Sequence, residues 1–393
     1  MIDSLYIAWK YIVANRAKTI TLLSCITLIA ILPISLELLL DESERQLLSR
    51  AVTTPLVIGI RGSSLDLVMN TLYYGDEIPD FISMEAADQV SKSGLALPVP
   101  MYVRFQARGY PIVGTTLDYF EFRGLTLGEG RQLAILGDCV IGASVAEKLD
   151  LGPGDSLISS PENLLDLAGV YPLKMHVRGV LDKSHTTDDL AVFVDLKTAW
   201  VIEGLGHGHL DVTKTTDKSL VLRKTDTNVA ATAKLEHYNE ITEENIDTFH
   251  FHGNSSVYPV TAVIAVPHDE KSGTILQGRY LSRDEMLMIV KPKEVVDTML
   301  QNIFRIRNVL DAVILVVGFA TVLAIVLVFA LSVRLRKREI GTIFRLGCRK
   351  LTIARFLGAE IGIIVIMSAV ICTGILIVLN LYASDLVRML FIR

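Results

Sequence analysis

Three segments of about 20 residues are almost free of charged side chains, and they limit what the chain can fold into. They cover residues 19–40, 309–333 and 361–381. A helix of that length spans the roughly 30 Å hydrocarbon core of a bilayer, where backbone polar groups must be paired internally. The segments also explain why 51% of the residues are hydrophobic and why the mean hydropathy is +0.44. We therefore predict transmembrane helices over 19–41, 308–334 and 351–382.

The first apolar segment also resembles a signal peptide, because Lys10, Arg16 and Lys18 precede it. Its apolar run is longer than a signal peptide requires, and it leads into Asp41, Glu42 and Glu44 without a small-residue cleavage pattern. We interpret it as a retained anchor. Residues 1–18 repeat apolar side chains at helical spacing, which predicts an amphipathic helix on the cytoplasmic membrane surface with lipids as partners.

Basic residues set the orientation of the spans. They cluster before the first span and between the second and third, at 334–338 and 345–355. Cytoplasmic loops carry such an excess of Lys and Arg, so residues 42–307 are expected outside the cytoplasm. The tail, residues 383–393, is expected outside or in the membrane interface.

The large outer region has a mixed pattern. Runs rich in β-branched residues predict strands at 56–60, 101–105, 111–114 and 260–266, while 84–91, 143–149 and 230–237 are typical of helices. We therefore expect a membrane α-helical protein of three spans with a large α+β extracytoplasmic domain of two lobes. A formal net charge of -5 gives no basic field, which excludes nucleic acid as a partner.

The cytoplasmic segment 335–350 has the most specific pattern in the chain. Ile340, Ile343 and Phe344 form an apolar side that can dock in the groove of a partner. Arg338, Glu339 and Arg345 surround that side. A basic patch beside a bilayer can also bind anionic lipid, which explains the charge but not the apolar side.

This segment resembles the signature of the MacB/FtsX/LolC permease family. The matching residues are Arg336, Arg338, Glu339, Ile340, Gly341, Arg345 and Gly347. The runs 114–120, 129–131, 140–146 and 151–155 also follow the order of that family. The resemblance implies that 335–350 is a coupling helix engaging a cytoplasmic ATPase, with Ile343 and Phe344 in its apolar side. It also implies a MacB-like domain at 42–307. Family members usually have a fourth span near the C-terminus, and we expect either that this helix is missing here or that the tail from Tyr382 replaces it in part.

The resemblance implies a non-catalytic permease subunit in the bacterial inner membrane, paired with a second copy or a paralogue. No GxxxxGK[ST] phosphate loop occurs in the sequence, so ATP and Mg²⁺ are expected on a separate ABC ATPase subunit. ATP hydrolysis would drive movements of the periplasmic domain, for export through an adaptor or for lipoprotein extraction. The alternative is a membrane receptor that senses a metal or another ligand through its outer domain.

Two histidine pairs stand out in the outer region. His207 and His209 alternate with glycine, and His250 and His252 alternate with phenylalanine. Residues i and i+2 share one face of a strand, so each pair can offer two imidazoles to zinc or copper. Surface histidines without a ligand role give the same pattern, and both readings stay open at this point.

Overall fold

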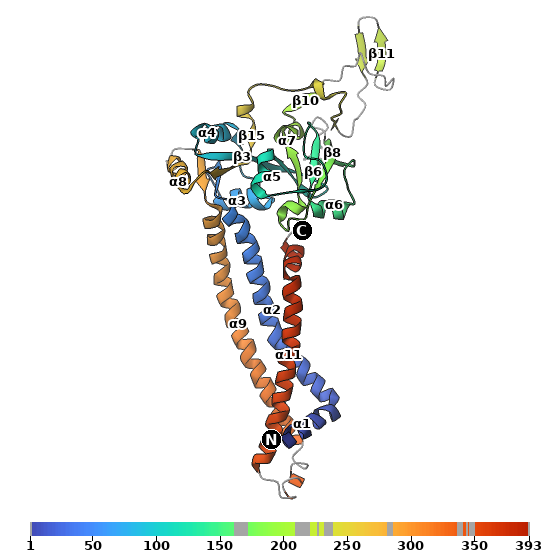
Figure 1. Cartoon of the computed structure of the whole chain (residues 1–393), viewed down its shortest axis with the longest axis vertical. Helices are drawn as coiled ribbons and strands as arrows, with labels where there is room; N and C mark the ends of the chain where they lie inside the picture. The colour runs from blue at the N-terminus through green and yellow to red at the C-terminus, as the bar shows by residue number, and fades with distance from the viewer. Residues whose placement is uncertain are drawn as a thin grey trace. The chain divides into compact units, whose positions relative to one another are not determined.

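The computed structural model describes residues 2–160, 172–208, 221–225, 228–231, 239–280, 286–335, 341–342, 345 and 350–391. The chain divides into two compact units. Met1–Leu47 and Thr298–Arg393 form unit 1, and Leu48–Asp297 form unit 2. Unit 1 consists of long helices, and unit 2 contains every strand that the structure describes (Figure 1).

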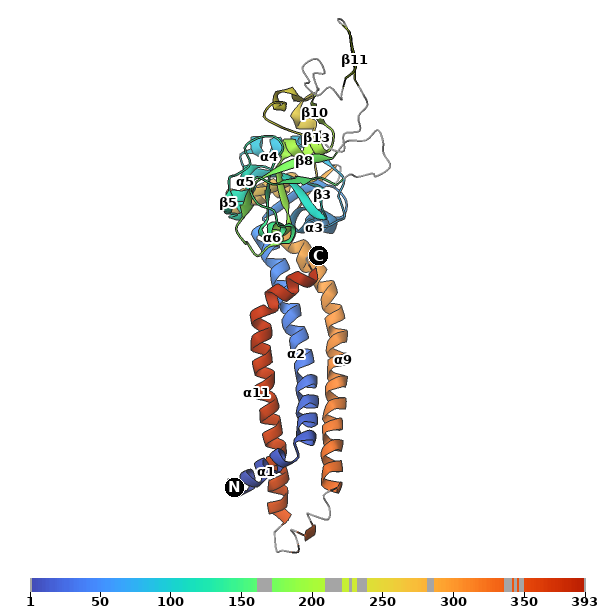
Figure 2. The same ribbon diagram turned by 90° about the vertical axis from the view of Figure 1, so that its right-hand side faces the viewer.

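Unit 1 is built from α1 (Ile2–Ala14) and α11 (Lys350–Phe391), with most of α2 (Arg16–Thr53) and α9 (Pro292–Leu335). The axes of the three long helices are roughly aligned, and α9 runs in the opposite direction to α2 and α11 (Figures 1 and 2). Among the described residues, two helices are long and apolar enough to cross a membrane, at Thr19–Thr53 and Ala354–Ala383. The sequence predicted a further span at 308–334. This segment is helical within α9, but many of its side chains lie outside the described residues, so the third span stays a prediction.

Helix α1 packs against α11. Ala8 and Ile12 are buried, and Ile12 forms an apolar cluster with Leu22 and Ile364. Leu5, Trp9 and Val13 of the same helix are exposed. A helix is thus present at α1 within the predicted range 1–18. Its place on the cytoplasmic membrane surface stays a prediction, and its exposed apolar residues keep membrane lipid as the predicted partner of that side.

Helices α2 and α11 also share a polar contact inside unit 1. The buried hydroxyls of Thr27 and Ser368 are 3.0 Å apart, and the Cys372 thiol lies 3.6 Å from the carbonyl oxygen of Thr27. Small polar side chains of this kind let two membrane helices approach closely. Helix α11 continues to Phe391, so the predicted tail begins as the end of this helix.

Unit 2 contains one large mixed sheet with the strand order β13-β8-β6-β9-β4-β3-β16-β1-β17, in which β5 and β7 also pair with β8. Its strands are β1 Leu56–Ile60, β3 Ala96–Ala107, β4 Tyr110–Thr115, β5 Leu127–Gly130, β6 Asp138–Ile141, β7 Ser156–Ile158, β8 Leu173–Leu181, β9 Val192–Asp195, β13 Asn239–Glu240, β16 Ala262–Pro267 and β17 Leu287–Val290. The described residues form three further two-stranded ladders, from β2 Ile82–Ser83 with β15 Pro259–Val260, β10 Gly206–Gly208 with β14 Phe249–Phe251, and β11 Val221–Thr225 with β12 Asn228–Ala231.

Strand β3 joins the two halves of the large sheet. Its first part, from Ala96 to Met101, pairs antiparallel with β16, and its second part, from Tyr102 to Ala107, pairs antiparallel with β4. The first half continues to β1 and β17, and the second to β9, β6, β8 and β13. The two lobes expected from the sequence are therefore two halves of one sheet within one compact unit.

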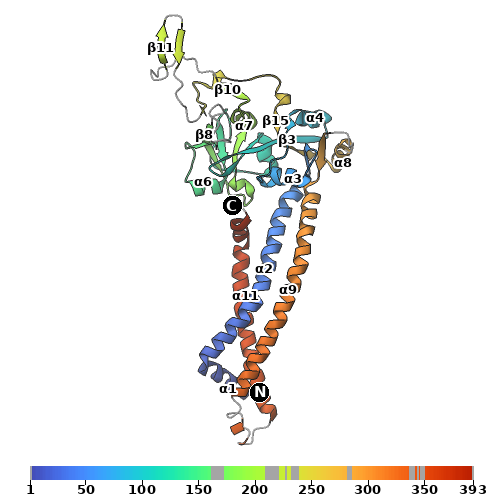
Figure 3. The ribbon, with the colours of Figure 1, turned by 180° about the vertical axis from the view of Figure 1, so that it is seen from behind.

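Short helices cover this sheet (Figure 3). They are α3 Ser64–Tyr73, α4 Glu85–Ser93, α5 Leu117–Arg123, α6 Ala143–Leu149, α7 Leu196–Ile202 and α8 Glu270–Arg279, with single 3₁₀ turns η1 Thr187–Leu190, η3 Ile246–Thr248 and η4 Ser255–Val257. Helix α7 lies so close to β4 that a Cβ on Gly114 would be 2.6 Å from that of Ala199. The buried core extends across both halves of the sheet, from Ile58 and Val263 to Val177 and Val192.

The pattern of strands and helices read from the sequence is largely present. One predicted helix is wrong, because Ala230 and Ala231 belong to strand β12. The sequence there is polar and has no sustained helical periodicity, so helix propensity alone misled the prediction. The remainder of that predicted helix, 232–237, lies outside the described residues.

Candidate functional site

Arg50 is a buried charged side chain in the last turn of α2. This turn belongs to unit 2. The helix ends here because Pro55 disfavours helical backbone at the residue before it. The hydroxyls of Thr53 and Thr54 donate to the Arg50 carbonyl at 3.1 and 2.9 Å, which satisfies an acceptor that the ending helix leaves open. The Arg50 side chain is only 6% exposed.

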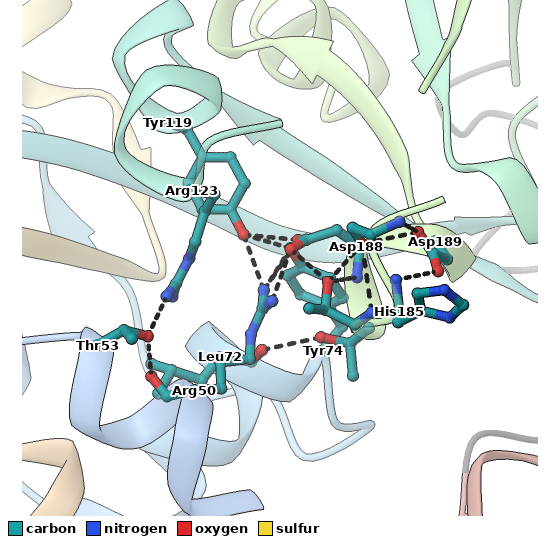
Figure 4. A network of polar contacts seen from close by, with 12 residues as sticks. Arg50, Thr53, Leu72, Tyr74, Tyr119, Arg123, His185, Asp188 and Asp189 are labelled. Atoms are coloured by element: carbon teal, nitrogen blue, oxygen red, sulfur yellow. Dashed lines mark hydrogen bonds and ion pairs between the residues drawn. The ribbon is translucent and has the colours of Figure 1, made fainter. Parts of the chain in front are cut away.

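Arg50 forms a two-point ion pair with Asp188, in the 3₁₀ turn η1 (Figure 4). Its Nη1 donates to Asp188 Oδ2 at 2.6 Å, and its Nη2 donates to Asp188 Oδ1 at 2.9 Å. The Asp188 side chain is 1% exposed. Paired bonds of this kind fix orientation as well as distance, because the planar guanidinium matches the carboxylate.

Two tyrosine hydroxyls complete the network. Arg50 Nη2 lies 3.1 Å from the oxygen of Tyr74 and 2.8 Å from that of Tyr119. Both hydroxyls donate to Asp188 Oδ1, at 2.5 and 2.8 Å. Tyr74 reaches this position because it caps α3 in the left-handed backbone conformation, with a φ of 57°. Tyr119 comes from α5.

Asp188 is held by its own turn. Thr186 caps η1, since its hydroxyl accepts from the Asp188 amide, and the same hydroxyl lies 2.9 Å from Asp188 Oδ2. The neighbouring Asp189 accepts from the amides of Ser184 and His185, both at 2.8 Å. Gly142 packs directly beneath the turn, and a Cβ there would lie 2.3 Å from the carbonyl oxygen of Asp188. The turn therefore cannot shift without losing several bonds.

The electrostatics of the network favour a charged carboxylate and neutral tyrosines. Burial by itself would raise the pKa of Asp188, but the charge and hydrogen bonds of Arg50, with the bond from Tyr74, hold this pKa well below its usual range. Burial raises the pKa of Tyr74 and of Tyr119, and the Asp188 charge adds to both effects. The hydroxyls accordingly stay protonated and can donate to the carboxylate.

A second arginine adjoins the network. Arg123, at the end of α5, lies with Nη1 3.4 Å from the Thr53 hydroxyl and with its guanidinium 5.7 Å from the centre of the Tyr119 ring. It therefore adds positive charge beside the end of α2, and it further favours the charged form of Asp188.

The network joins both halves of the sheet to the end of α2. Arg50 leads into β1 and Tyr74 follows α3, on the first half, whereas Tyr119 lies on α5 after β4 and Asp188 leads into β9, on the second. Removing one partner of a buried ion pair typically costs about 3–5 kcal/mol, because the remaining charge is buried without compensation. The last turn of α2 is therefore attached to both halves of the sheet by buried polar contacts.

Most of the cytoplasmic residues singled out in the sequence lie outside the residues that the structure describes. Gly341 and Arg345 are described, both in helical conformation, and Arg345 is exposed. Arg336, Arg338, Glu339, Ile340, Ile343, Phe344 and Gly347 lie outside the described residues. The coupling segment therefore stays a prediction.

The histidines singled out in the sequence are partly brought together. His207 of β10 stands opposite His250 of β14, and His252 follows directly after β14. His209 lies outside the described residues. In the described part of the chain, no three His, Cys, Asp or Glu side chains come together as a metal site. The metal site also stays a prediction.

Sequence reasoning did not single out Arg50, Tyr74 or Asp188. A local signal exists for Arg50, since a charged residue stands among Leu47, Leu48 and Ala51 just before a helix-ending proline. Nothing local points to Asp188, which lies 138 positions away.

A comparison with known protein families identifies the family to which the domain of unit 2 is similar. Residues 43–238 match the family described as the MacB-like periplasmic core domain. The chain belongs to the MacB/FtsX-type family of ABC transporter permeases. Unit 2 is accordingly the MacB-like extracytoplasmic domain, and Arg50, Tyr74, Tyr119 and Asp188 all lie in the matched region. Permeases of this family work with an ABC ATPase, and they are generally non-catalytic.

Several solved structures are similar to part of the chain. The periplasmic region of MacB from Actinobacillus actinomycetemcomitans is 14% identical, with 64% of this chain and 92% of that one covered and a TM-score of 0.35. The extracellular domain of the noncanonic ABC-type transporter YknZ from Gram-positive bacteria is 11% identical, with coverage of 60% and 98% and a TM-score of 0.33. A domain of a putative permease protein from Porphyromonas gingivalis is 13% identical, with coverage of 60% and 85% and a TM-score of 0.27. No curated relative matches the chain by sequence.

Proposed function

We propose that this MacB/FtsX-type chain is the transmembrane permease subunit that couples ATP hydrolysis by a separate cytoplasmic ATPase to movement of its periplasmic domain. The observation that carries the proposal is the Arg50–Asp188 network, which fixes the end of α2 to both halves of the domain sheet. A helix that crosses the membrane can deliver work to an outer domain only if its end is firmly attached there. The buried, two-point ion pair supplies that attachment.

In this proposal the cytoplasmic segment 335–350 receives the push of the ATPase. The apolar side of Ile340, Ile343 and Phe344 docks on the ATPase, and Glu339 and Arg345 set the orientation by charge. The helices through 308–334 and 19–41 then carry the movement to the periplasmic side of the inner membrane.

The output that we propose is mechanical work on a periplasmic partner, by export through an adaptor or by extraction of a lipoprotein. The chain would act with a second copy or a paralogue, as its membership of the MacB/FtsX-type family implies. ATP and Mg²⁺ would bind to the ATPase, since the sequence has no phosphate loop.

The experiment that tests the proposal is purification of the full chain in mild detergent from its native membrane. We expect an ABC-type ATPase to accompany it in near-equal amount. Hydrogen exchange is then measured with and without a non-hydrolysable ATP analogue, and we expect altered protection in η1 and at the end of α2.

Control samples carry a charge reversal at exposed Glu294, which should leave the response unchanged. Absence of an ATPase would refute the proposal and leave the receptor alternative. Recovery of an ATPase without any nucleotide effect on the domain would refute the mechanical part alone.

A further inference from the structure

Arg123, in the last turn of α5, carries two buried hydrogen-bond donors that no described residue accepts. They are Nε and Nη2 of its guanidinium. These two nitrogens hold parallel N–H groups on one side of the planar group, which is an arrangement that binds an anion at two points. We call this donor pair the Arg123 fork. The third nitrogen, Nη1, lies 3.4 Å from the Thr53 hydroxyl.

Aromatic contacts of Arg123 do not satisfy the fork. The guanidinium carbon lies 4.7 Å from the centre of the Phe122 ring and 5.7 Å from that of the Tyr119 ring. Such contacts attract the positive charge to the face of a ring, whereas the hydrogen bonds of a guanidinium lie in its own plane. Because a buried charged donor without an acceptor is costly, the fork indicates an acceptor from outside the described residues.

The described carboxylates near the fork do not balance the charge there. Asp188 binds Arg50 through both of its oxygens. Asp189 accepts from two backbone amides of its own loop. Arg123 has no carboxylate partner among the described residues, and an arginine keeps its proton in proteins, so burial cannot be relieved by neutralisation. The two arginines therefore leave one positive charge over after pairing with Asp188.

Arg50 and Arg123 lie together at the last turn of α2 (Figure 4). The Thr53 hydroxyl donates to the Arg50 carbonyl at 3.1 Å and is also the group that Arg123 Nη1 contacts. The Tyr119 hydroxyl accepts from Arg50 at 2.8 Å, and its ring contacts Arg123. The Arg50 side chain is 6% exposed, and its Nε is a further buried donor without a described partner. Both charges therefore attract an anion at the fork.

We propose that the Arg123 fork binds a small monovalent anion of the chloride class. One negative charge balances the positive charge that Asp188 leaves over, and a halide accepts two parallel N–H groups at once. Both donors are buried, which favours a small ion over a partner side chain, while the Arg123 side chain as a whole is only half-buried and gives access from solvent. The bound ion would link the end of α5 to the end of α2. This site does not depend on the ATPase coupling.

The test uses the full chain in detergent, purified in sodium gluconate without halide. Chloride is then added at constant ionic strength, and its binding is measured from the broadening of the ³⁵Cl nuclear magnetic resonance line. We expect saturable binding in the wild type. Arg123→Gln should lower the affinity roughly tenfold or more, because it removes the charged donor pair.

The matched control is Arg279→Gln, which removes an exposed arginine from the last turn of α8. It should bind chloride as the wild type does. Replacing gluconate by chloride should raise the melting temperature of the wild type and of Arg279→Gln, and leave that of Arg123→Gln unchanged. A purely structural role of Arg123 would instead lower the melting temperature of Arg123→Gln by the same amount in both salts.

A second variant covers the case in which Arg123→Gln does not fold. Arg123→Lys keeps the charge but lacks the fork, so it should also bind chloride at least about tenfold more weakly. Crystals of the full chain grown in bromide locate the ion by anomalous scattering, and we expect the peak within hydrogen-bond distance of Nε and Nη2 of Arg123. The proposal is overturned if the wild type shows no saturable chloride binding, if the Arg123 variants bind as tightly as Arg279→Gln, or if bromide is absent from the fork.

Discussion

Arg50 and Asp188, 138 positions apart in the sequence, face each other in a buried two-point ion pair with N–O distances of 2.6 and 2.9 Å. The pair connects the last turn of a long apolar helix to the 3₁₀ turn before β9. In a MacB/FtsX-type permease this contact lies where a helix that is long and apolar enough for the membrane enters the periplasmic domain.

Removing one member of this pair should destabilise the domain strongly. Asp188→Asn leaves the Arg50 charge buried without its counter-charge, so we expect a loss of about 3–5 kcal/mol in the free energy of unfolding. The double variant Arg50→Met with Asp188→Leu removes both charges and should be more stable than Asp188→Asn alone. Chemical denaturation of the full chain in detergent measures the free energy of unfolding of the wild type and of both variants.

The control is Glu294→Gln, which breaks an exposed contact with Lys291 and should cost at most about 1 kcal/mol. Equal losses for Glu294→Gln and Asp188→Asn would contradict the importance of the buried pair.

At acid pH, the change in the free energy of unfolding with pH should reflect the protonation of Asp188. Its folded-state pKa lies below the unfolded value of about 3.9, so its contribution is complete above pH about 4 and is lost as the pH falls toward the folded-state pKa. The stability difference between wild type and Asp188→Asn should stay constant from pH 8 to about 5 and shrink below about 4. A difference that already shrinks between pH 7 and 5 would argue against the assignment.

At alkaline pH, the change in the free energy of unfolding with pH should reflect the ionisation of the buried tyrosines. Burial raises the pKa of Tyr73 to about 12, and it raises that of Tyr74 as well. The unfolded chain releases these protons near pH 10, so stability should be complete below about pH 10 and fall as the pH rises toward 12. Tyr74→Phe should make this fall shallower. An unchanged slope would show that Tyr74 ionises as readily in the folded protein as in the unfolded chain.

Gly142 should tolerate no side chain. A Cβ there would lie 2.3 Å from the Asp188 carbonyl oxygen and 2.4 Å from that of Asp189, both backbone atoms of η1. Gly142→Ala should therefore cost about 1–3 kcal/mol, as overpacking does, and should displace the Arg50–Asp188 pair. Gly152→Ala is the control, because nothing lies within 4 Å of its Cβ position. Thermal unfolding compares the two, and equal melting temperatures would contradict the prediction.

Charge reversal in the cytoplasmic segment should separate the ATPase from the permease. Glu339→Lys with Arg345→Glu should weaken ATPase binding at least about tenfold, since like charges brought together at an interface cost several kcal/mol. As a control, Lys350→Glu reverses a charge at the last position of the segment, at a residue outside the family match. Pull-down of the ATPase from membranes that express each variant gives the comparison. If the double variant binds the ATPase as fully as the wild type does, the segment is not part of the ATPase interface.

Sequence alone predicted those elements whose pattern is local. The long apolar helices, strands such as 56–60 and 111–114, and the helix at 143–149 follow from side chains that bury one face or a whole segment. The prediction failed at 230–231, where a polar stretch pairs as β12 with β11 and the pairing, not the propensity, decides the conformation.

Only the tertiary structure decided which distant residues meet. The two histidine pairs were visible in the sequence, but the antiparallel register of β10 and β14 determines that His207 stands opposite His250. Likewise, nothing near Asp188 in the sequence points to Arg50, Tyr74 or Tyr119. Periodicity reports the burial of a face within one element, whereas contacts between elements depend on strand order and on the turns that join them.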